Sequence, residues 1–242
     1  MRKIVLKRLA IIAGCIFIFF SCKKEKDNKI IAANLRVKTV TNGNSVMSYS
    51  YDDKKRMVKS ESDVGFFKDE FLYEGTTITR TISEPSNTVS IRYSLDANGY
   101  LTSSRYTNSQ DVSFYEHTSD GTLIRSYDDD VPAFEARYYY NANTGLLDSM
   151  RATKGTVWVY TNLFSFYADR INTIDNENFG QMFWGSFSPH PTKSVVTRRP
   201  DGNVINVTFT NYTYTYNEEG IITSRSFSTS GGQSGTESYT YY

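Results

Sequence analysis

Hydrophobic and polar side chains alternate along most of the chain from residue 35 to residue 242. In one such stretch Val89, Ile91 and Tyr93 share one face, while Ser90 and Arg92 share the other. A period of two is typical of a β-strand with one buried and one solvated face. No segment of comparable length has the apolar spacing of a helix. The same alternation recurs over residues 67–73, 77–82 and 134–140.

Turn signals separate these stretches about every ten residues. Glycine after Asn, Asp, Thr or Glu suits a tight hairpin, because glycine adopts positive φ without strain. Regularly spaced hairpins indicate a sandwich or a barrel. We therefore predict an all-β fold: an antiparallel up-and-down meander of about 14 to 16 strands, in an open or closed barrel-like sheet. It would form a single domain over residues 34–242. The turn glycines include Gly99, Gly121, Gly145 and Gly220.

A degenerate repeat runs through the predicted meander. Each copy begins with Tyr, passes a short polar turn that usually ends on Gly, and continues with an apolar residue and a nearby Ser. This order resembles the YD repeats of Rhs-type proteins, which build long β-sheets from stacked hairpins. Glycine supplies the positive φ of each hairpin, and the Tyr that ends one strand can pack near the apolar residue that begins the next, so we interpret the repeat as a folding device. The copies cover residues 51–60, 93–103, 115–126, 140–149 and 216–224.

The late part of the chain carries a second resemblance. An aromatic and Pro-Thr-Lys stretch at residues 183–193 precedes a Tyr-rich hairpin over residues 204–224. This arrangement is similar to that of uncharacterised prolipoproteins of the phylum Bacteroidota, whose domain of unknown function is described as porin-like in fold. The resemblance implies a porin-like fold. It supplies no catalytic residue, since that family has no assigned activity.

The first residues have the features of a secretory signal. Residues 1–8 carry four basic side chains and no acidic one, and residues 9–20 form an apolar run of 12 residues. A helix needs about 20 apolar residues to cross a bilayer, so we interpret this run as part of a cleaved signal. The sequence FFSC that ends at Cys22 resembles the bacterial lipobox, in which the Cys is diacylated and becomes the first residue of the mature protein.

These features predict a lipoprotein that contacts the membrane through a lipid on Cys22. Residues 1–21 would be the signal peptide, and residues 22–33 would be the lipidated Cys and a tether, in which the charged stretch 23–29 should be solvated. Short charged runs behind the lipidated Cys resemble the sorting signals of Bacteroidota lipoproteins. That resemblance implies an outer-membrane location, on the periplasmic or the cell-surface face.

Composition narrows the classes of function. The chain is 39% hydrophobic, 22% charged and 15% aromatic, which is enough to bury a sizeable β-rich core. Without the signal peptide, 23 basic and 26 acidic side chains leave a net charge of about −3. A nucleic-acid partner would need a basic field, so we predict none. Cys15 lies in the signal, so Cys22 would be the only Cys of the mature chain and an internal disulfide is excluded.

The sequence contains no recognisable catalytic or metal-binding motif. We interpret His117 as an outward-facing strand residue and His190, which lies between two prolines, as part of a rigid loop. The acids at 128–130 lack the Gly and the terminal Glu of a calcium loop. We therefore expect no metal, no cofactor and no enzymatic activity. The scattered acids nevertheless leave a glycosidase pair open.

Residues 157–167 depart from the alternation, because both faces of this stretch are apolar or aromatic. A strand covered on its second face would have this pattern, and the aromatic residues 176–192 are the segment able to cover it. We favour that packing. The alternative is a groove for sugar or peptide, because flat aromatic rings with polar edges suit such ligands. Its candidate ligand-binding aromatics are Trp158, Tyr160, Phe183 and Trp184.

The leading functional hypothesis is a lipid-anchored envelope protein that is non-catalytic and binds a glycan, peptide or protein partner. The alternatives are a polysaccharide-acting enzyme, a structural scaffold and an outer-membrane β-barrel. About ten residues per strand suits a membrane barrel. Arginines in mid-strand, among them Arg80, Arg92 and Arg137, oppose insertion. The sequence leaves the ligand and the oligomeric state open.

Overall fold

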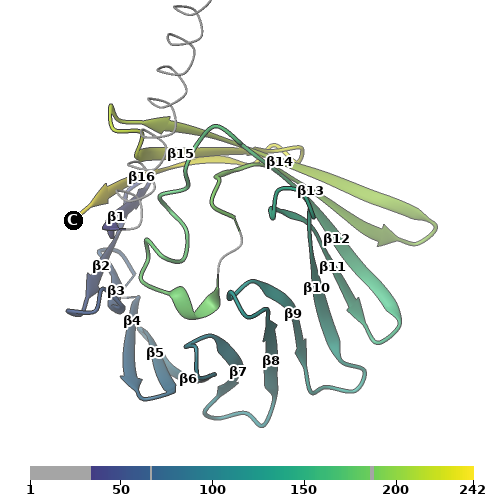
Figure 1. The fold of residues 1–242 in the computed structure, drawn as a ribbon, viewed down its shortest axis with the longest axis horizontal. Helices are drawn as coiled ribbons and strands as arrows, with labels where there is room; N and C mark the ends of the chain where they lie inside the picture. The colour runs from purple at the N-terminus through teal and green to yellow at the C-terminus, as the bar shows by residue number, and fades with distance from the viewer. Residues whose placement is uncertain (1–33, 66, 186–187) are drawn as a thin grey trace, which may run out of the picture.

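The protein is a closed antiparallel barrel of 16 strands, seen in a computed structural model that describes residues 34–65, 67–185 and 188–242 (Figure 1). Each strand pairs with the next along the chain, and β1 pairs with β16 to close the sheet. The predicted all-β meander is therefore confirmed, in its closed form. The strands are β1 (Val37–Asn42), β2 (Ser45–Tyr51), β3 (Met57–Ser62), β4 (Lys68–Glu74), β5 (Thr77–Glu84), β6 (Asn87–Leu95), β7 (Leu101–Tyr106), β8 (Val112–His117), β9 (Leu123–Asp128), β10 (Phe134–Tyr140), β11 (Leu147–Lys154), β12 (Val157–Phe166), β13 (Thr192–Asp201), β14 (Val204–Tyr216), β15 (Ile222–Thr229) and β16 (Ser234–Tyr241).

The alternation of the sequence separates a lumenal face from an outer face. Ile78 on β5 pairs with Tyr93 on β6, and both are almost fully buried. The next pair along the same strands, Thr79 with Arg92, faces the opposite side of the sheet. Successive side chains of a strand point to opposite faces, so apolar residues fill the lumen here and polar residues cover the outside.

The predicted turn glycines have the backbone conformation that the hairpins require. Gly99, Gly121, Gly145 and Gly220 all have positive φ, between 67° and 88°. At Gly121 a Cβ would also lie 2.1 Å from the Tyr100 ring, so that ring would have to move. The turn assignment at these four positions is confirmed.

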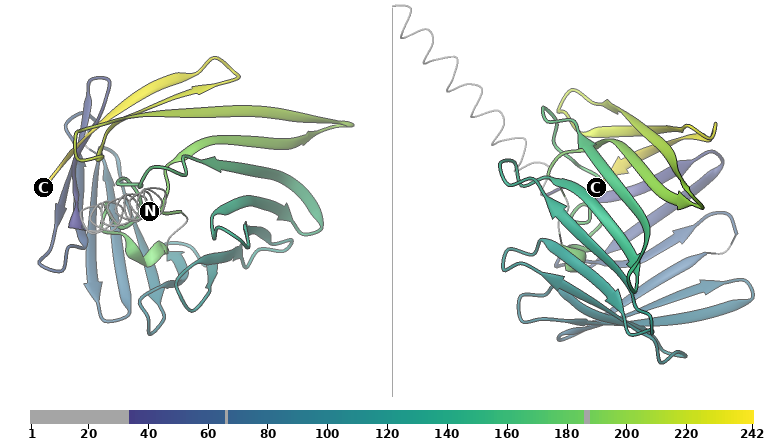
Figure 2. Two further views of the ribbon diagram at one scale, coloured as in Figure 1. Left: turned by 45° about the horizontal axis from the view of Figure 1, so that its top comes forward. Right: turned by 90° about the vertical axis from the view of Figure 1, so that its right-hand side faces the viewer.

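The connection between β12 and β13 turns into the lumen instead of crossing the rim (Figures 1 and 2). We call residues 167–185 and 188–191 the plug segment. It contains the short 3-10 helix η1 (Met182–Trp184). Polar residues and Gly dominate it, and turns rather than strands shape it. A barrel of this strand number would otherwise enclose open space.

Aromatic side chains of the plug segment pack against the wall made by β2 to β8. The Phe179 ring lies 5.1 Å from Tyr49, and the Phe183 ring lies 5.6 Å from Tyr93. Trp184 contacts Tyr93 and also Tyr115, at 5.8 and 5.5 Å between ring centroids. The prediction that residues 176–192 cover the strand at 157–167 is wrong, because these rings lie on β2, β6 and β8.

Backbone hydrogen bonds fasten the plug segment to the same side of the barrel. The carbonyl of Asn178 accepts from the Val37 N–H at 3.0 Å, and the carbonyl of Gly180 accepts from the Met57 N–H at 3.2 Å. Gly180 has a φ of 67°, and a Cβ there would lie 2.7 Å from the Met57 nitrogen. The close approach of two backbones therefore requires glycine at this position.

The predicted signal peptide, Cys22 and tether lie outside the described residues. Within the part of the chain that the structure describes, no helix is long and apolar enough to cross a bilayer.

Candidate functional site

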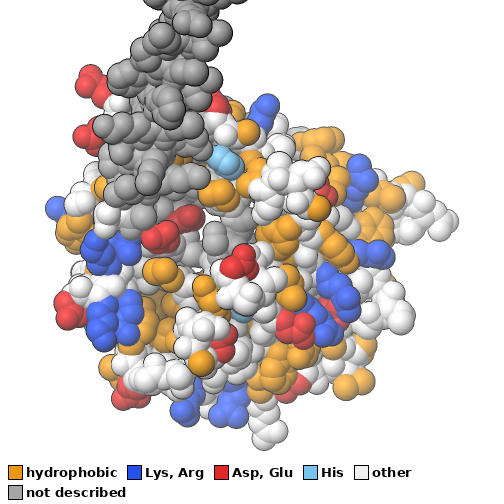
Figure 3. Space-filling model, in the orientation of Figure 1, with side chains coloured by type: hydrophobic (Ala, Val, Ile, Leu, Met, Phe, Trp, Pro, Cys, Tyr) orange, Lys and Arg blue, Asp and Glu red, His pale blue; other side chains and the backbone are white. Residues whose placement is uncertain are grey.

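A cavity of about 460 Å³ lies between the plug segment and the opposite wall of the barrel. Its size falls within the usual range of small-molecule sites, about 300 to 1,000 Å³. The space-filling view shows this end of the barrel hollowed near its centre, with acidic and hydrophobic side chains around the hollow (Figure 3). The wall contributes Tyr138, Leu147, Phe164, Phe166, Thr192, Tyr214 and Arg225, and the plug segment contributes Asn172, Ile174, Asp175, Asn176, Glu177, Met182, Gly185, Ser188 and His190.

The wall side of the cavity is aromatic. Phe164 and Phe166 are inward residues of β12 and stack with 6.5 Å between ring centroids. Tyr214 of β14 fixes its ring by donating from its hydroxyl to the Thr192 carbonyl at 2.8 Å. Tyr138 of β10 adds a further lining side chain. Flat apolar rings held in this way provide a stacking surface for a ligand.

The plug side of the cavity is polar and locally ordered. Asn176 donates from Nδ2 to the Gly185 carbonyl at 3.0 Å. His190 donates from Nδ1 to the Arg170 carbonyl at 2.6 Å. Ser188 accepts the His190 N–H at 3.1 Å and fixes this turn. The cavity therefore has aromatic rings on its wall side and amide, hydroxyl and imidazole groups on its plug side.

Two of the cavity's carboxylates serve turns of the backbone. Asp175 accepts the N–H groups of Glu177 and Asn178 at 3.0 and 3.3 Å. Burial raises the pKa of Asp175 to about 6, and the charge of Glu177 adds to this effect. Asp120 accepts from the Thr118 hydroxyl in the turn between β8 and β9. Carboxylates engaged in this way do not resemble the paired acids of a glycoside hydrolase.

One cation lines the cavity and is paired inside the wall. Arg225 donates from Nη2 and Nε to a Glu237 carboxylate oxygen at 2.6 and 3.1 Å. Tyr239 donates to the same oxygen at 2.5 Å. The pair brings no net charge to the cavity, so it does not create a site for an anion.

The four aromatics proposed from the sequence do not form one site. Phe183 is buried, and Trp184 packs with it on the far side of the plug segment. Tyr160 faces the lumen beside Phe134, with 6.4 Å between ring centroids. Trp158 faces outward, since its indole donates to the Thr161 hydroxyl at 3.0 Å.

A β-bulge explains why Trp158 and Tyr160 lie on opposite faces. Ala152 of β11 pairs with Tyr160, and the next residue, Thr153, pairs with Trp158. The extra residue on β12 reverses the alternation at this point. On the outer face Trp158 borders a shallow hollow of about 370 Å³ with Tyr139, Ser149, Arg151 and Thr161.

The histidines and the acidic triplet have structural surroundings. His117 faces the lumen, stacks on Tyr100 at 5.6 Å and lies 3.4 Å from the Trp184 carbonyl through Nε2. The prediction that it faces outward is wrong, because the face it shares with Tyr115 is the inner one. Asp128 and Asp129 accept backbone N–H groups next to their turn. Among the residues described, no group of three or more His, Cys, Asp or Glu is placed to hold a metal ion.

Sequence reasoning missed most of the cavity. Phe164 and Phe166 belong to the apolar stretch 157–167, for which the sequence favours packed side chains rather than a cavity lining. Tyr214 and Arg225 follow ordinary strand alternation, and Asp175 lies in a polar loop. The two-faced apolar run at residues 157–167 and the aromatic segment 176–192 are the two signals that the sequence gives for this region.

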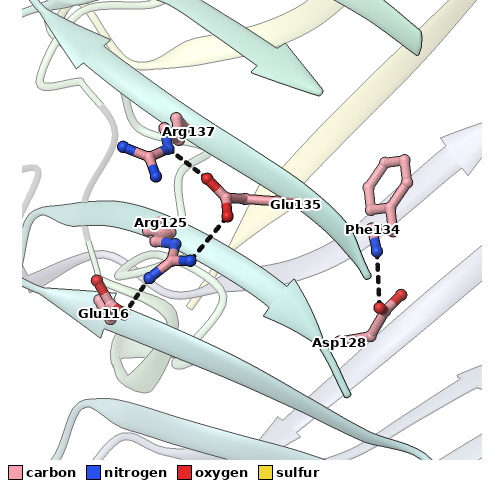
Figure 4. Close-up of polar contacts among 6 residues, drawn as sticks. All are labelled: Glu116, Arg125, Asp128, Phe134, Glu135 and Arg137. Carbon is pink, nitrogen blue, oxygen red and sulfur yellow. Dashed lines mark hydrogen bonds and ion pairs between the residues drawn. The ribbon is translucent and has the colours of Figure 1, made fainter. Parts of the chain in front are cut away.

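Charged and hydroxyl side chains cover much of the outer face. Arg125 of β9 donates to Glu116 of β8 at 3.0 Å and to Glu135 of β10 at 2.7 Å, and Arg137 also donates to Glu135 (Figure 4). Lipid-facing walls carry instead an apolar band about 25 Å tall. Elsewhere on the outer face, hydroxyls pair across strands at Thr81 and Ser90, Thr215 and Ser224, and Ser226 and Thr236.

No protein-family profile matches the sequence, and no curated protein sequence matches it. Among solved structures, the fold is similar to that of a porin-like protein from Bacteroides uniformis, with a TM-score of 0.60 and 14% sequence identity. The match covers 86% of this chain and 96% of that chain. The porin-like fold implied by the sequence resemblance is therefore shown, and at this identity the likeness concerns the fold alone.

Proposed function

We propose that the protein is a lipid-anchored, non-catalytic envelope barrel that binds a small neutral saccharide in its lumenal cavity. The observation that carries the proposal is the cavity itself, with aromatic faces on the β12 and β14 side and amide and hydroxyl groups on the plug side. A sugar ring presents apolar C–H faces and hydroxyl edges. Such a ligand matches both sides of the cavity at once.

Two of the charged groups that line the cavity are already engaged, which favours a neutral ligand. Arg225 is paired with Glu237, and Asp175 is held by backbone N–H groups. A charged ligand would need an unpaired group of opposite sign in a partly desolvated site. The turn hydrogen bonds of Asp120 and Asp175 favour binding over two-carboxylate hydrolysis.

The outer face supports anchoring beside the membrane rather than insertion as a porin. Arg125, Arg137 and their carboxylate partners would lie in lipid if this wall spanned a bilayer. Arg and Lys side chains on a lipid-facing barrel wall are destabilising by about 2 to 4 kcal/mol each at mid-depth. A lipid on Cys22 would hold the barrel at the membrane without that cost.

Ligand binding is tested by calorimetric titration of the detergent-extracted protein with neutral mono- and disaccharides. We expect at least one of these sugars to bind and to be recovered unchanged. Phe164→Ala should weaken its affinity at least tenfold, because the stacking surface is lost. The matched control is Trp158→Ala, an aromatic truncation on the outer face, which should leave affinity unchanged. Absence of binding, or equal effects of both variants, contradicts the proposal, and cleavage of the sugar favours the enzyme alternative.

Anchoring is tested with Cys22→Ala in the full chain. The unchanged protein should stay with membranes after a high-salt wash, and the variant should appear in the aqueous fraction, folded and without detergent. Retention of the variant in membranes would favour the outer-membrane barrel alternative.

A further inference from the structure

The hairpin formed by β13 and β14 projects beyond the neighbouring strands of the wall (Figures 1 and 2). β14 is paired with β13 from Val204 to Asn211, but with β15 only from Thr210 to Tyr216. Among the described strands, residues 204–208 thus have a partner on one side alone. This part of β14 is an open edge of the barrel wall.

The backbone groups of two residues face the open side of this edge. Phe209, the residue that follows the open edge along β14, contacts the turn between β15 and β16, since Ser230 donates its N–H to the Phe209 carbonyl at 2.9 Å. The Phe209 N–H in turn donates to the Ser230 hydroxyl at 3.1 Å. Backbone groups of a strand alternate sides, so Ile205 and Val207 direct N–H and C=O to the same side as Phe209. Beyond Ser230, none of the described strands pairs with these two residues on that side.

The two edges of the hairpin differ in how well they are protected against pairing with another strand. On the β13 side, pairing with β12 ends at Arg198, and the next residues are Arg199, Pro200 and Asp201. Charges and proline are the usual means of preventing edge-to-edge association. On the β14 side the sequence VINVTF over 204–209 has neither. Its apolar side chains are exposed, at 65% for Val204, 57% for Ile205 and 48% for Phe209.

We propose that the open edge of β14 pairs antiparallel with the same edge of a second copy of this chain. Centring the pair on Asn206 places Ile205 opposite Val207 of the partner. Their outward backbone groups then form four hydrogen bonds across the interface. Asn206 lies opposite its own copy as a non-hydrogen-bonded pair. The result is a continuous four-stranded sheet that joins two barrels through a twofold axis.

Charge favours a second copy as the occupant. A twofold pairing places like residues near like, so any charge on the edge would repel its own copy. From Val204 to Tyr216 the strand has no charged residue. The paired β-branched side chains of Ile205 and Val207 would bury apolar surface on one face of the joined sheet. The edge is short, so association is weak and needs high local concentration.

The test is disulfide trapping of Asn206→Cys in the full chain, in membranes of the expressing cells. A non-hydrogen-bonded antiparallel pair has Cα atoms about 4.5 Å apart, within the range that a disulfide spans. We expect most of the chain to run at twice its mass after mild oxidation without reductant. Ile205→Cys should give at least tenfold less dimer, because position 205 faces 207 and not itself. Val207→Pro or Val207→Lys, combined with Asn206→Cys, should also reduce the dimer at least tenfold.

The control is Val157→Cys, an exposed residue in another hairpin turn at the same end of the barrel. It should react with a maleimide without forming a dimer. Equal dimer from Val157→Cys would show random collision and overturn the proposal. So would a monomeric Asn206→Cys chain whose thiol reacts with maleimide, or an adduct of a mass other than twice the chain.

Discussion

Along β2 to β8 the plug segment fills the lumen, whereas along β10 to β14 the same lumen is open as the cavity. On the filled side Phe183 and Ile78 are 5% and 1% exposed and belong to one core cluster. On the open side the inward rings of Phe164 and Tyr214 border the cavity. Both sides have the same strand geometry, so the difference arises from where the plug segment lies.

This contrast separates stability from binding within one sheet. Packed aromatic side chains contribute most to the free energy of unfolding where no space remains around them. Rings that line a cavity contribute less to stability and remain available to a ligand. The filled half should therefore be sensitive to truncation, and the open half should tolerate it.

The largest expected effect is from Phe183→Ala. Removing a buried ring leaves a cavity, and the free energy of unfolding should fall by about 3 to 5 kcal/mol. Phe164→Ala is the matched change on the open side and should cost less than about 1.5 kcal/mol, because its ring already borders space. Urea unfolding followed by fluorescence measures both. Equal losses would show that the two halves are packed alike.

A smaller effect is expected from Gly180→Ala. The added Cβ would lie 2.7 Å from the Met57 nitrogen and would require positive φ, so it should loosen the plug segment from β3. We expect a loss of about 2 to 3 kcal/mol. Gly145→Ala is the control, since it also has positive φ but nothing within 4 Å of the new Cβ. Its loss should be about 1 kcal/mol. Similar melting temperatures for the two variants would contradict a close contact at Gly180.

The next prediction concerns pH and Asp175. Its pKa is raised from 3.8 to about 6 in the folded protein, so the unfolded chain loses this proton first as pH rises. The group therefore lowers stability between about pH 4 and pH 6, and its effect is constant above pH 6. Asp175→Asn keeps the turn acceptor and removes the charge. At pH 7.5 the melting temperature of the variant should be about 2 to 4 °C higher than that of the unchanged protein. At pH 3.5 the two melting temperatures should be equal. A gain independent of pH would show that this carboxyl titrates normally.

The smallest effect is expected on the outer face. Glu135→Gln breaks the pairs with Arg125 and Arg137, which are partly exposed and screened by solvent. The free energy of unfolding should fall by less than about 1 kcal/mol, and less in 1 M salt. A larger loss in chemical unfolding would mean that the outer ion pairs, rather than the plug segment, decide which half is rigid.

The strands and turns could be predicted from the sequence because their causes are local. Alternation identifies the two faces of a strand, and glycine marks positive φ at the turns, as at Gly99 and Gly220. The position of the plug segment could not be predicted in the same way. Within a closed barrel an inward loop can reach several strands, and the choice of β6 and β8 depends on the fit of Phe183 and Trp184 there.

The cavity could not be predicted from the sequence for a related reason. The apolar inner face of β12 predicts that something lies opposite, but the same pattern suits a packed segment or a ligand. The bulge beside Trp158 shifts the alternation by one residue and carries no distinctive sequence. The contribution of Asp175 depends on its burial, which is a property of the assembled barrel.

The bond between Val37 and Asn178 has a kinetic consequence. Besides β2, which follows it directly, β1 has two partners, β16 and the plug segment, that lie far along the chain. Contacts of such wide separation make folding slow, because a long loop must be ordered before they form. An emerging chain therefore exposes the unpaired edge of β1 until Tyr241 has arrived. During that interval, a holding chaperone rather than the barrel would protect the first strand from aggregation.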